Sequence, residues 1–229
     1  MSVGGPAGAS GPPLVLVVAD DLGYDPAIDA GILEAHRDGV VTATSALVDG
    51  PFGAAAIRSA PPTLAVGLHL DLPAGTGEER AREELLRQLR AFEEARGAPP
   101  THLDGHRHVH AEPGVLAAVL RVAGPLGLRV RALDPAMRDR IRAAGARAAD
   151  RFVGDADLRP CWTPDALAAA ARAVLPGTTE IMIHPGHLPT LVRTSFAAER
   201  EEELRAATAP AVRAAFAAAG ARLVGVLPE

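Results

Sequence analysis

Two adjacent aspartates are the first residues of this sequence whose type and spacing could do chemistry. Asp20 and Asp21 directly follow the apolar run of residues 14–19. Neighbouring carboxylates point in different directions, so one can bind a metal ion while the other accepts a proton. The alternative is a helix cap or a turn that carries two solvated acids, and taken alone the pair favours this alternative.

A histidine-rich segment gives the strongest local signal. The stretch THLDGHRHVH, residues 101–110, holds four of the eight histidines of the chain. In an extended stretch alternate side chains project to one side, so two or three of these rings would face a single site. Imidazole is a common ligand for borderline metal ions. The alternatives are an expression tag or a solvated loop, but the position in mid-chain and the interleaved Leu, Asp and Val favour a metal site at a strand end.

Two further histidines follow apolar runs. His69 lies in GLHLDL between leucines, and taken alone it is more typical of a satisfied core histidine than of a ligand. His184 lies in EIMIHPGH, where an apolar run precedes it and Pro185–Gly186 breaks the strand immediately afterwards. A histidine held on such a bend is well placed to donate a proton, although a strand-end histidine with no task is the alternative. His187 makes a weaker case.

The elements that must position these residues alternate along the chain. Apolar or β-branched runs predict about seven strands, at residues 14–19, 40–47, 64–70, 101–106, 128–132, 180–184 and 223–226. Helical patterns follow Asp25 up to a stop at Gly39, and cover residues 52–59, 78–96, 113–123, 135–150, 164–174 and 196–219. This alternation predicts a parallel sheet, which a chain of 229 residues can close into a single-domain (β/α) barrel.

The chemically capable residues share one position on these elements. Asp20 with Asp21, His69, His106 and His184 each stand at or just beyond the C-terminal end of a different predicted strand. In barrels and in open parallel sheets this is the edge where active sites form. We therefore expect four strands to direct ionisable groups to one rim.

Composition excludes several classes of function. The formal charge is −5 with no basic cluster, so no nucleic-acid footprint is expected. No apolar run approaches the roughly 20 residues of a membrane span. The single cysteine, Cys161, fits a reducing cytoplasm. Residues 1–13 lack the pattern of a secretory signal, and their Gly, Pro, Ser and Ala content predicts a disordered tail before one domain at 14–229.

Four motifs together resemble the YdjC-like carbohydrate deacetylases, a family that includes chitooligosaccharide and hopanoid-biosynthesis deacetylases. They are VVADDLGYDPAIDAGILEAHRDGVVTATSALVDG, VGLHL, PPTHLDGHRHVH and EIMIHPGH, in the family's order, and the resemblance runs from about Leu14 to the C-terminus. It implies a deacetylase-type barrel that hydrolyses the acetyl group from an N-acetylated sugar or small glycoconjugate.

The resemblance also implies residue roles. Asp21, His69 and His106 would bind one divalent metal ion, with Asp20 as general base and His184 as general acid. The ion would be Mg²⁺ or Zn²⁺, with Mn²⁺ or Co²⁺ also compatible. Further residues are expected to orient the ligands or to contact the substrate: Asp104, His108, His110 and His187.

Two rival functions remain open at this point. Metal-dependent amidohydrolases and phosphoesterases also place His-x-His clusters at strand ends, usually after the first strand, whereas here the cluster follows about the fourth. A barrel with silent chemistry that binds a metal and a sugar is the second rival, although Asp20 and His184 would be superfluous there. A homodimer would be ordinary for such a domain.

Overall fold

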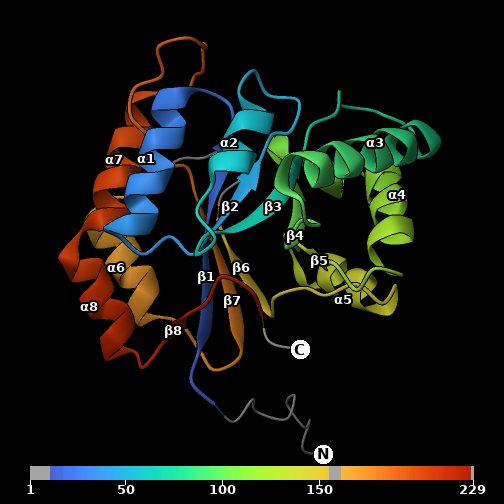
Figure 1. The fold of residues 1–229 in the computed structure, drawn as a ribbon. Helices are drawn as coiled ribbons and strands as arrows, with labels where there is room; N and C mark the ends of the chain where they lie inside the picture. Colours follow the sequence, from blue (N-terminus) through green and yellow to red (C-terminus); the bar gives the residue numbers. More distant parts are fainter. Residues whose placement is uncertain (1–10, 155–160, 228–229) are drawn as a thin grey trace, which may run out of the picture.

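The computed structural model describes residues 11–154 and 161–227, and they form a parallel β-sheet surrounded by helices (Figure 1). The expected tail lies mostly at residues 1–10, outside the described part of the chain. The strands are β1 (Leu14–Leu22), β2 (Ala43–Ala46), β3 (Ala65–Leu70), β4 (His102–Gly105), β5 (Arg129–Val130), β6 (Arg151–Val153), β7 (Thr178–Ile183) and β8 (Arg222–Leu223).

Hydrogen-bonded neighbours follow the order β5-β4-β3-β2-β1-β7-β6, and each of these pairings is parallel. β8 pairs with the start of β1, where Leu14 and Val15 lie opposite Arg222 and Leu223. Among the described residues no ladder joins β5 to β6, so the barrel stays open between these two strands. The predicted (β/α) barrel of about seven strands is thus confirmed, in the form of a half-barrel.

Helices cover the outside of this sheet. They are α1 (Pro26–Arg37), α2 (Gly53–Ser59), α3 (Glu78–Arg96), α4 (Pro113–Ala123), α5 (Pro135–Ala143), α6 (Pro164–Arg172), α7 (Ala198–Thr208) and α8 (Pro210–Ala218). Figure 1 shows α1, α6, α7 and α8 on one side of the strands and α3, α4 and α5 on the other. In the described part of the chain no helix is both long and apolar enough to cross a membrane.

Two predicted helices were wrong in extent. The helix expected over residues 135–150 ends at Ala143, because Gly145 takes a left-handed φ of 86° that a helix cannot continue through. The chain then forms the short strand β6, which the sequence pattern did not predict. The helix expected over 196–219 is divided at Pro210, which begins α8 and cannot donate the hydrogen bond that would continue α7.

The segment after β4 differs most from the prediction. Instead of remaining extended, His106–Ala111 forms a short 3₁₀ helix in which Arg107 and His108 both have positive φ, 51° and 57°. Gly105 permits this fold-back, because a Cβ at that position would stand 2.8 Å from the backbone nitrogen of His110. The histidines of this segment therefore do not all point to one side, although two of them, His106 and His108, line one cavity.

Candidate active site

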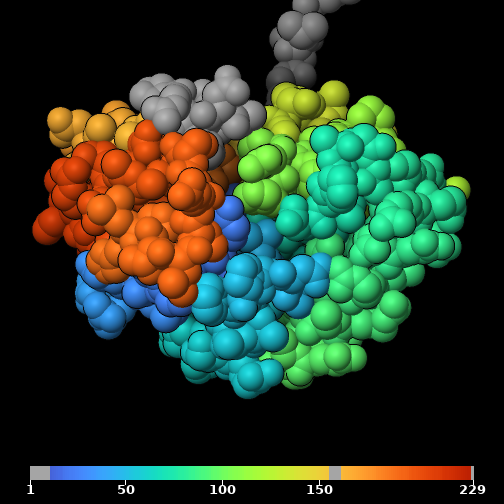
Figure 2. Space-filling model, turned by 90° about the horizontal axis from the view of Figure 1, so that it is seen from above, coloured from blue at the N-terminus to red at the C-terminus, as the bar shows by residue number. Residues whose placement is uncertain are grey.

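The C-terminal ends of the strands surround a cavity of about 370 Å³. It falls within the range of about 300–1,000 Å³ typical of small-molecule sites. Figure 2 shows its opening between the segment that precedes α7, in orange, and the segment that follows β4, in green. Its lining includes every residue for which the sequence predicted a metal or catalytic role: Asp20, Asp21, His69, His106 and His184.

An irregularity at the end of β1 brings both aspartates to this cavity. Consecutive residues of a regular strand point to opposite faces. Here the pairing with β2 shifts register between Ala19 and Leu22, and Asp21 has a left-handed φ of 79°. A non-glycine residue in this conformation costs on the order of 1–3 kcal/mol, and such strain concentrates at functional sites. The strained turn thus directs two buried carboxylates into one cavity.

Asp21, His69 and His106 form a cluster with the geometry of a metal site. Oδ1 of Asp21 lies 3.4 Å from Nε2 of His69 and 3.2 Å from Nδ1 of His106. One ligand atom from each residue lies within 4.8 Å of the other two. Two imidazoles and one carboxylate oxygen suit a borderline divalent ion, and three protein ligands leave positions for water and substrate. The residues present therefore fit the group that the sequence predicted.

A second grouping of donor atoms, Asp20 with His69 and Asp104, is less suited to an ion. Its carboxylates already accept hydrogen bonds from the buried Arg131. Asp104 also lies outside the cavity lining, so an ion there would have to displace a guanidinium.

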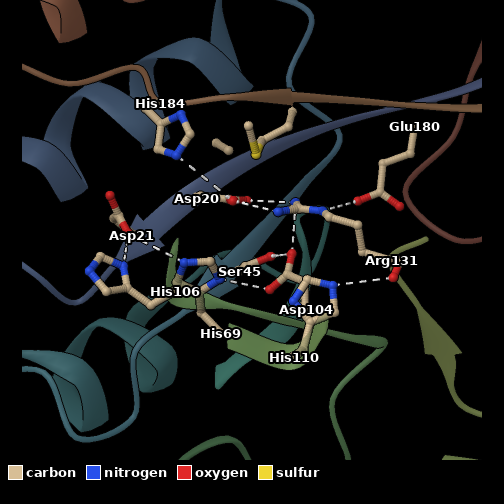
Figure 3. Close-up of polar contacts among 12 residues, drawn as sticks. Asp20, Asp21, Ser45, His69, Asp104, His106, His110, Arg131, Glu180 and His184 are labelled. Atoms are coloured by element: carbon tan, nitrogen blue, oxygen red, sulfur yellow. Dashed lines mark hydrogen bonds and ion pairs between the residues drawn. The ribbon is translucent and has the colours of Figure 1, made fainter. Parts of the chain in front are cut away.

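Asp104 contacts a residue of the first cluster, as the sequence predicted for a ligand-orienting group. Its Oδ1 lies 2.7 Å from Nδ1 of His69, and its Oδ2 accepts from Oγ of Ser45 at 2.6 Å (Figure 3). Burial alone would lower the pKa of His69, but the carboxylates of Asp104 and Asp20 outweigh it and raise that pKa to about 10. The hydrogen bond fixes the ring so that Nε2 faces Asp21.

Arg131 is the centre of the buried charge network beneath the cavity. Its Nη1 and Nη2 donate to Oδ2 and Oδ1 of Asp20 at 2.6 and 2.8 Å, and Nη2 also lies 2.7 Å from Oδ2 of Asp104. Its Nε donates to Glu180 at 2.7 Å, and Arg129 pairs with the same glutamate. This fork holds both oxygens of Asp20 and fixes the direction of its free lone pairs. Figure 3 shows Arg131 between Asp20, Asp104 and Glu180.

His184 stands across the cavity from the cluster. Its Nε2 lies 3.9 Å from Oδ2 of Asp20, and its ring packs edge-on against Phe196. Its backbone N–H donates to the buried Glu203 of α7 at 2.5 Å, and Glu203 also accepts from the backbone of Trp162. Burial lowers the pKa of His184 to about 4, although Asp20 and Asp21 oppose that shift. The ring is therefore neutral near pH 7.

The other predicted histidines have different surroundings. His108 lines the cavity and lies edge-on to Phe152, whereas His110 is fully buried with Nε2 3.2 Å from the carbonyl oxygen of Arg131. Burial lowers the pKa of His110 to about 3. The structure does not bring His187 to the cavity, because its ring is half-exposed and lies 3.2 Å from Glu34 on α1.

One wall of the cavity is held by a residue that the sequence predicted only as a helix cap. Oδ1 of Asp25 accepts from Ala27 at the start of α1, as expected. Its Oδ2 accepts backbone N–H groups from three consecutive residues, Thr190, Leu191 and Val192, at 2.8–3.2 Å. The carboxylate thus anchors the loop that leads to the cavity-lining residues Arg193–Phe196.

Sequence reasoning missed several residues of the site. Arg131 and Glu180 lie on strands that it did predict, and an alternation of charged and apolar residues in Leu128–Arg131 was the available signal. Arg200 and Glu203 lie on α7, whose sequence AEREEELRAAT is rich in charged residues and resembles a solvated helix. Nothing in that pattern distinguishes these two buried residues from their exposed neighbours.

Comparison with known proteins finds extensive similarity. The sequence model of the YdjC-like protein family matches residues 14–82 and 76–218. A human carbohydrate deacetylase is 32% identical, with 91% of this chain and 88% of the relative covered. The carbohydrate deacetylase of Brevibacillus brevis is 34% identical over 85% and 91%. The chitooligosaccharide deacetylase of Serratia marcescens is 32% identical over 90% and 95%.

Solved structures show the same fold at lower identity. A protein of Enterococcus faecalis assigned to cellobiose-phosphate cleavage superposes with a TM-score of 0.83 at 24% identity, covering 93% of this chain and 97% of that one. A family 4 carbohydrate esterase of Streptomyces lividans, solved in complex with acetate, gives a TM-score of 0.54 at 14% identity, covering 91% and 90%.

Proposed function

Because this chain belongs to the YdjC-like protein family, we propose that it is a metal-dependent hydrolase that removes the acetyl group from an N-acetylated sugar. Relatives that are at least 30% identical over most of both chains are named carbohydrate or chitooligosaccharide deacetylases. The observation that carries the proposal is the clustering of Asp21, His69 and His106 in one cavity with a separate carboxylate, Asp20, beside them.

Asp21, His69 and His106 would hold the ion in this proposal. When bound there, a divalent ion lowers the pKa of water and polarises the acetamide carbonyl. Asp20 then accepts the proton of the attacking water. The two hydrogen bonds from Arg131 leave each oxygen of Asp20 one lone-pair direction and prevent the carboxylate from rotating.

His184 would deliver a proton to the leaving nitrogen. Since burial keeps this ring neutral near pH 7, it does not begin with a proton to donate. Asp20 gains one from water, and its Oδ2 lies 3.9 Å from Nε2 of His184. In this proposal the proton would pass from water to Asp20, would then have to cross this gap to His184, and would finally reach the amine as the C–N bond breaks. The products are acetate and the free amino sugar.

The substrate of the proposed reaction can be identified by a direct screen. The purified protein would be incubated with a divalent ion and a panel of N-acetylated mono- and disaccharides, and released acetate and released phosphate would be measured separately. Acetate release with formation of a free amine supports the proposal. Release of phosphate from phosphomonoesters without acetate from any N-acetyl sugar would favour the phosphoesterase alternative instead.

Ion binding is expected to release a proton from His69. With a pKa of about 10, the ring of the ion-free protein carries protons on both nitrogens near neutral pH, and Nε2 must lose its proton to bind an ion. Below that pKa the apparent association constant should rise by about tenfold per pH unit, and the rise should end as the pH passes 10. Calorimetry in two buffers of different ionisation enthalpy measures the released protons.

The control for this experiment is His36→Gln, a histidine of α1 that contacts Val41 and Thr63 and does not line the cavity, and this variant should leave proton release unchanged. Ion binding that is independent of pH between 7 and 9 would contradict the assignment of His69 as a ligand.

A further inference from the structure

Arg200, a buried residue of α7, contacts the cluster of Asp21, His69 and His106 from outside the strands. Its side chain is about 3% exposed, and its Nη2 donates to Oδ2 of Asp21 at 2.5 Å. Its Nε donates to the carbonyl oxygen of Phe196 at 3.0 Å, which fixes the guanidinium in place. The remaining nitrogen, Nη1, is buried without a hydrogen-bond partner in the described structure.

The two oxygens of Asp21 therefore have separate partners. Oδ1 faces both histidines of the cluster, at 3.4 and 3.2 Å, whereas Oδ2 is held by Arg200. A carboxylate can bind an ion through one oxygen or through both. With Oδ2 engaged by a guanidinium that is itself fixed by Phe196, only Oδ1 is free for an ion between the two rings.

The charge of Arg200 acts in the same direction as this geometry. A guanidinium is positively charged. That of Arg200 directly contacts the carboxylate of Asp21, which is one of the three residues of the cluster. It withdraws negative charge from Asp21 and repels a divalent ion, and in a buried site this repulsion is poorly screened. An ion held by a partly neutralised carboxylate is bound less tightly and is a stronger Lewis acid.

We propose that Arg200 restricts Asp21 to one-oxygen coordination and weakens ion binding, so that the ion keeps its power to polarise substrate. The inference rests on the proposed function, because it assumes an ion at Asp21, His69 and His106. It assigns Arg200 as a positioning residue that acts through Asp21. A residue that only stabilised the site would strengthen ion binding, whereas Arg200 is expected to oppose it.

The test compares the ion affinities of Arg200→Gln and Arg200→Lys by competition with a chromophoric chelator for Zn²⁺. Glutamine retains a neutral N–H donor and removes the charge, so R200Q should bind Zn²⁺ at least about tenfold more tightly than the wild type and show a lower kcat for acetate release. Lysine keeps the charge, so R200K should stay within about threefold of wild-type affinity. The matched control R205Q alters an exposed arginine of the same helix that pairs with Glu202, and should change neither value.

Weaker or unchanged Zn²⁺ binding by folded R200Q would overturn the inference while leaving the proposed function intact. A wild-type protein that binds no divalent ion would overturn both. If R200Q does not fold, X-ray absorption of the zinc-loaded wild type decides the question, because it distinguishes one-oxygen from two-oxygen carboxylate ligation. One-oxygen ligation is expected, and two-oxygen ligation would refute the role of Arg200.

Discussion

An Asp20→Asn variant is expected to have a kcat that is about 10²- to 10⁴-fold lower, while it still binds one divalent ion per chain. The loss is the contribution typical of a positioned general base, because an amide oxygen cannot take the proton of the attacking water. Ion binding should persist because Asp20 is not one of the three clustered residues Asp21, His69 and His106, and its two oxygens are held by Arg131 instead. Acetate release and metal content are measured on the same preparation.

The matched control for this variant is Asp49→Asn, the same substitution in an exposed carboxylate that pairs with Arg87. It should retain full activity. Full activity in the Asp20 variant would refute the assignment of the base, and loss of the ion would indicate that the two adjacent acids have exchanged roles.

Replacing Arg131 by Met is expected to destabilise the fold severely. The side chain is fully buried and partners three carboxylates, those of Asp20, Asp104 and Glu180. Burial alone would lower its pKa, but these carboxylates raise it well above its ordinary value. Removing one partner of a buried ion pair typically costs about 3–5 kcal/mol, which is a large part of the about 5–15 kcal/mol by which a domain is stable. Urea unfolding measures the change.

The control is Arg121→Met, which removes an arginine that is 66% exposed and pairs with Glu78 at the surface. Such pairs contribute about 0–1 kcal/mol, so this variant should unfold close to the wild type. An Arg131 variant with unchanged stability and activity would contradict both the buried network and the orientation of Asp20 described above.

The position of residues on strands predicted the centre of the site. A parallel sheet brings the C-terminal ends of its strands to one edge, so residues at the ends of β1, β3, β4 and β7 had to meet once the strands were identified. This rule brought Asp20, Asp21, His69, His106 and His184 to one cavity although they are distant in sequence. The rule needs only that the strands run parallel, which the alternation of strands with helices along the chain indicates.

The conformation of the histidine-rich segment could not be predicted in the same way. Alternation predicts a common face only while the chain remains extended, and the chain folds back at Gly105. Two successive left-handed residues, Arg107 and His108, are rare because their side chains disfavour that region. Tertiary packing imposes this conformation, and no local pattern in the sequence predicts it.

The charged residues that support the site could also not be predicted from the sequence. A buried arginine and an exposed arginine look alike in a helix such as α7, and only the tertiary packing of that helix shows that Arg200 and Glu203 face inward. Arg131 directly follows the two-residue strand β5, which is too short for periodicity to decide which face is buried. Such residues can be recognised as part of the site only when their partners on other strands are located in the structure.

If this chain uses one divalent ion to hydrolyse an N-acetyl group, its activity should depend on how many chains carry an ion. The most direct measurement strips the protein of metal with a chelator, returns an ion in substoichiometric steps, and follows acetate release from an N-acetylated sugar that the screen has identified. The stripped protein should be inactive, and activity should rise with occupancy to a plateau at one ion per chain. Full acetate release by the stripped protein, with metal content verified as negligible, would contradict a role for a divalent ion in the hydrolysis.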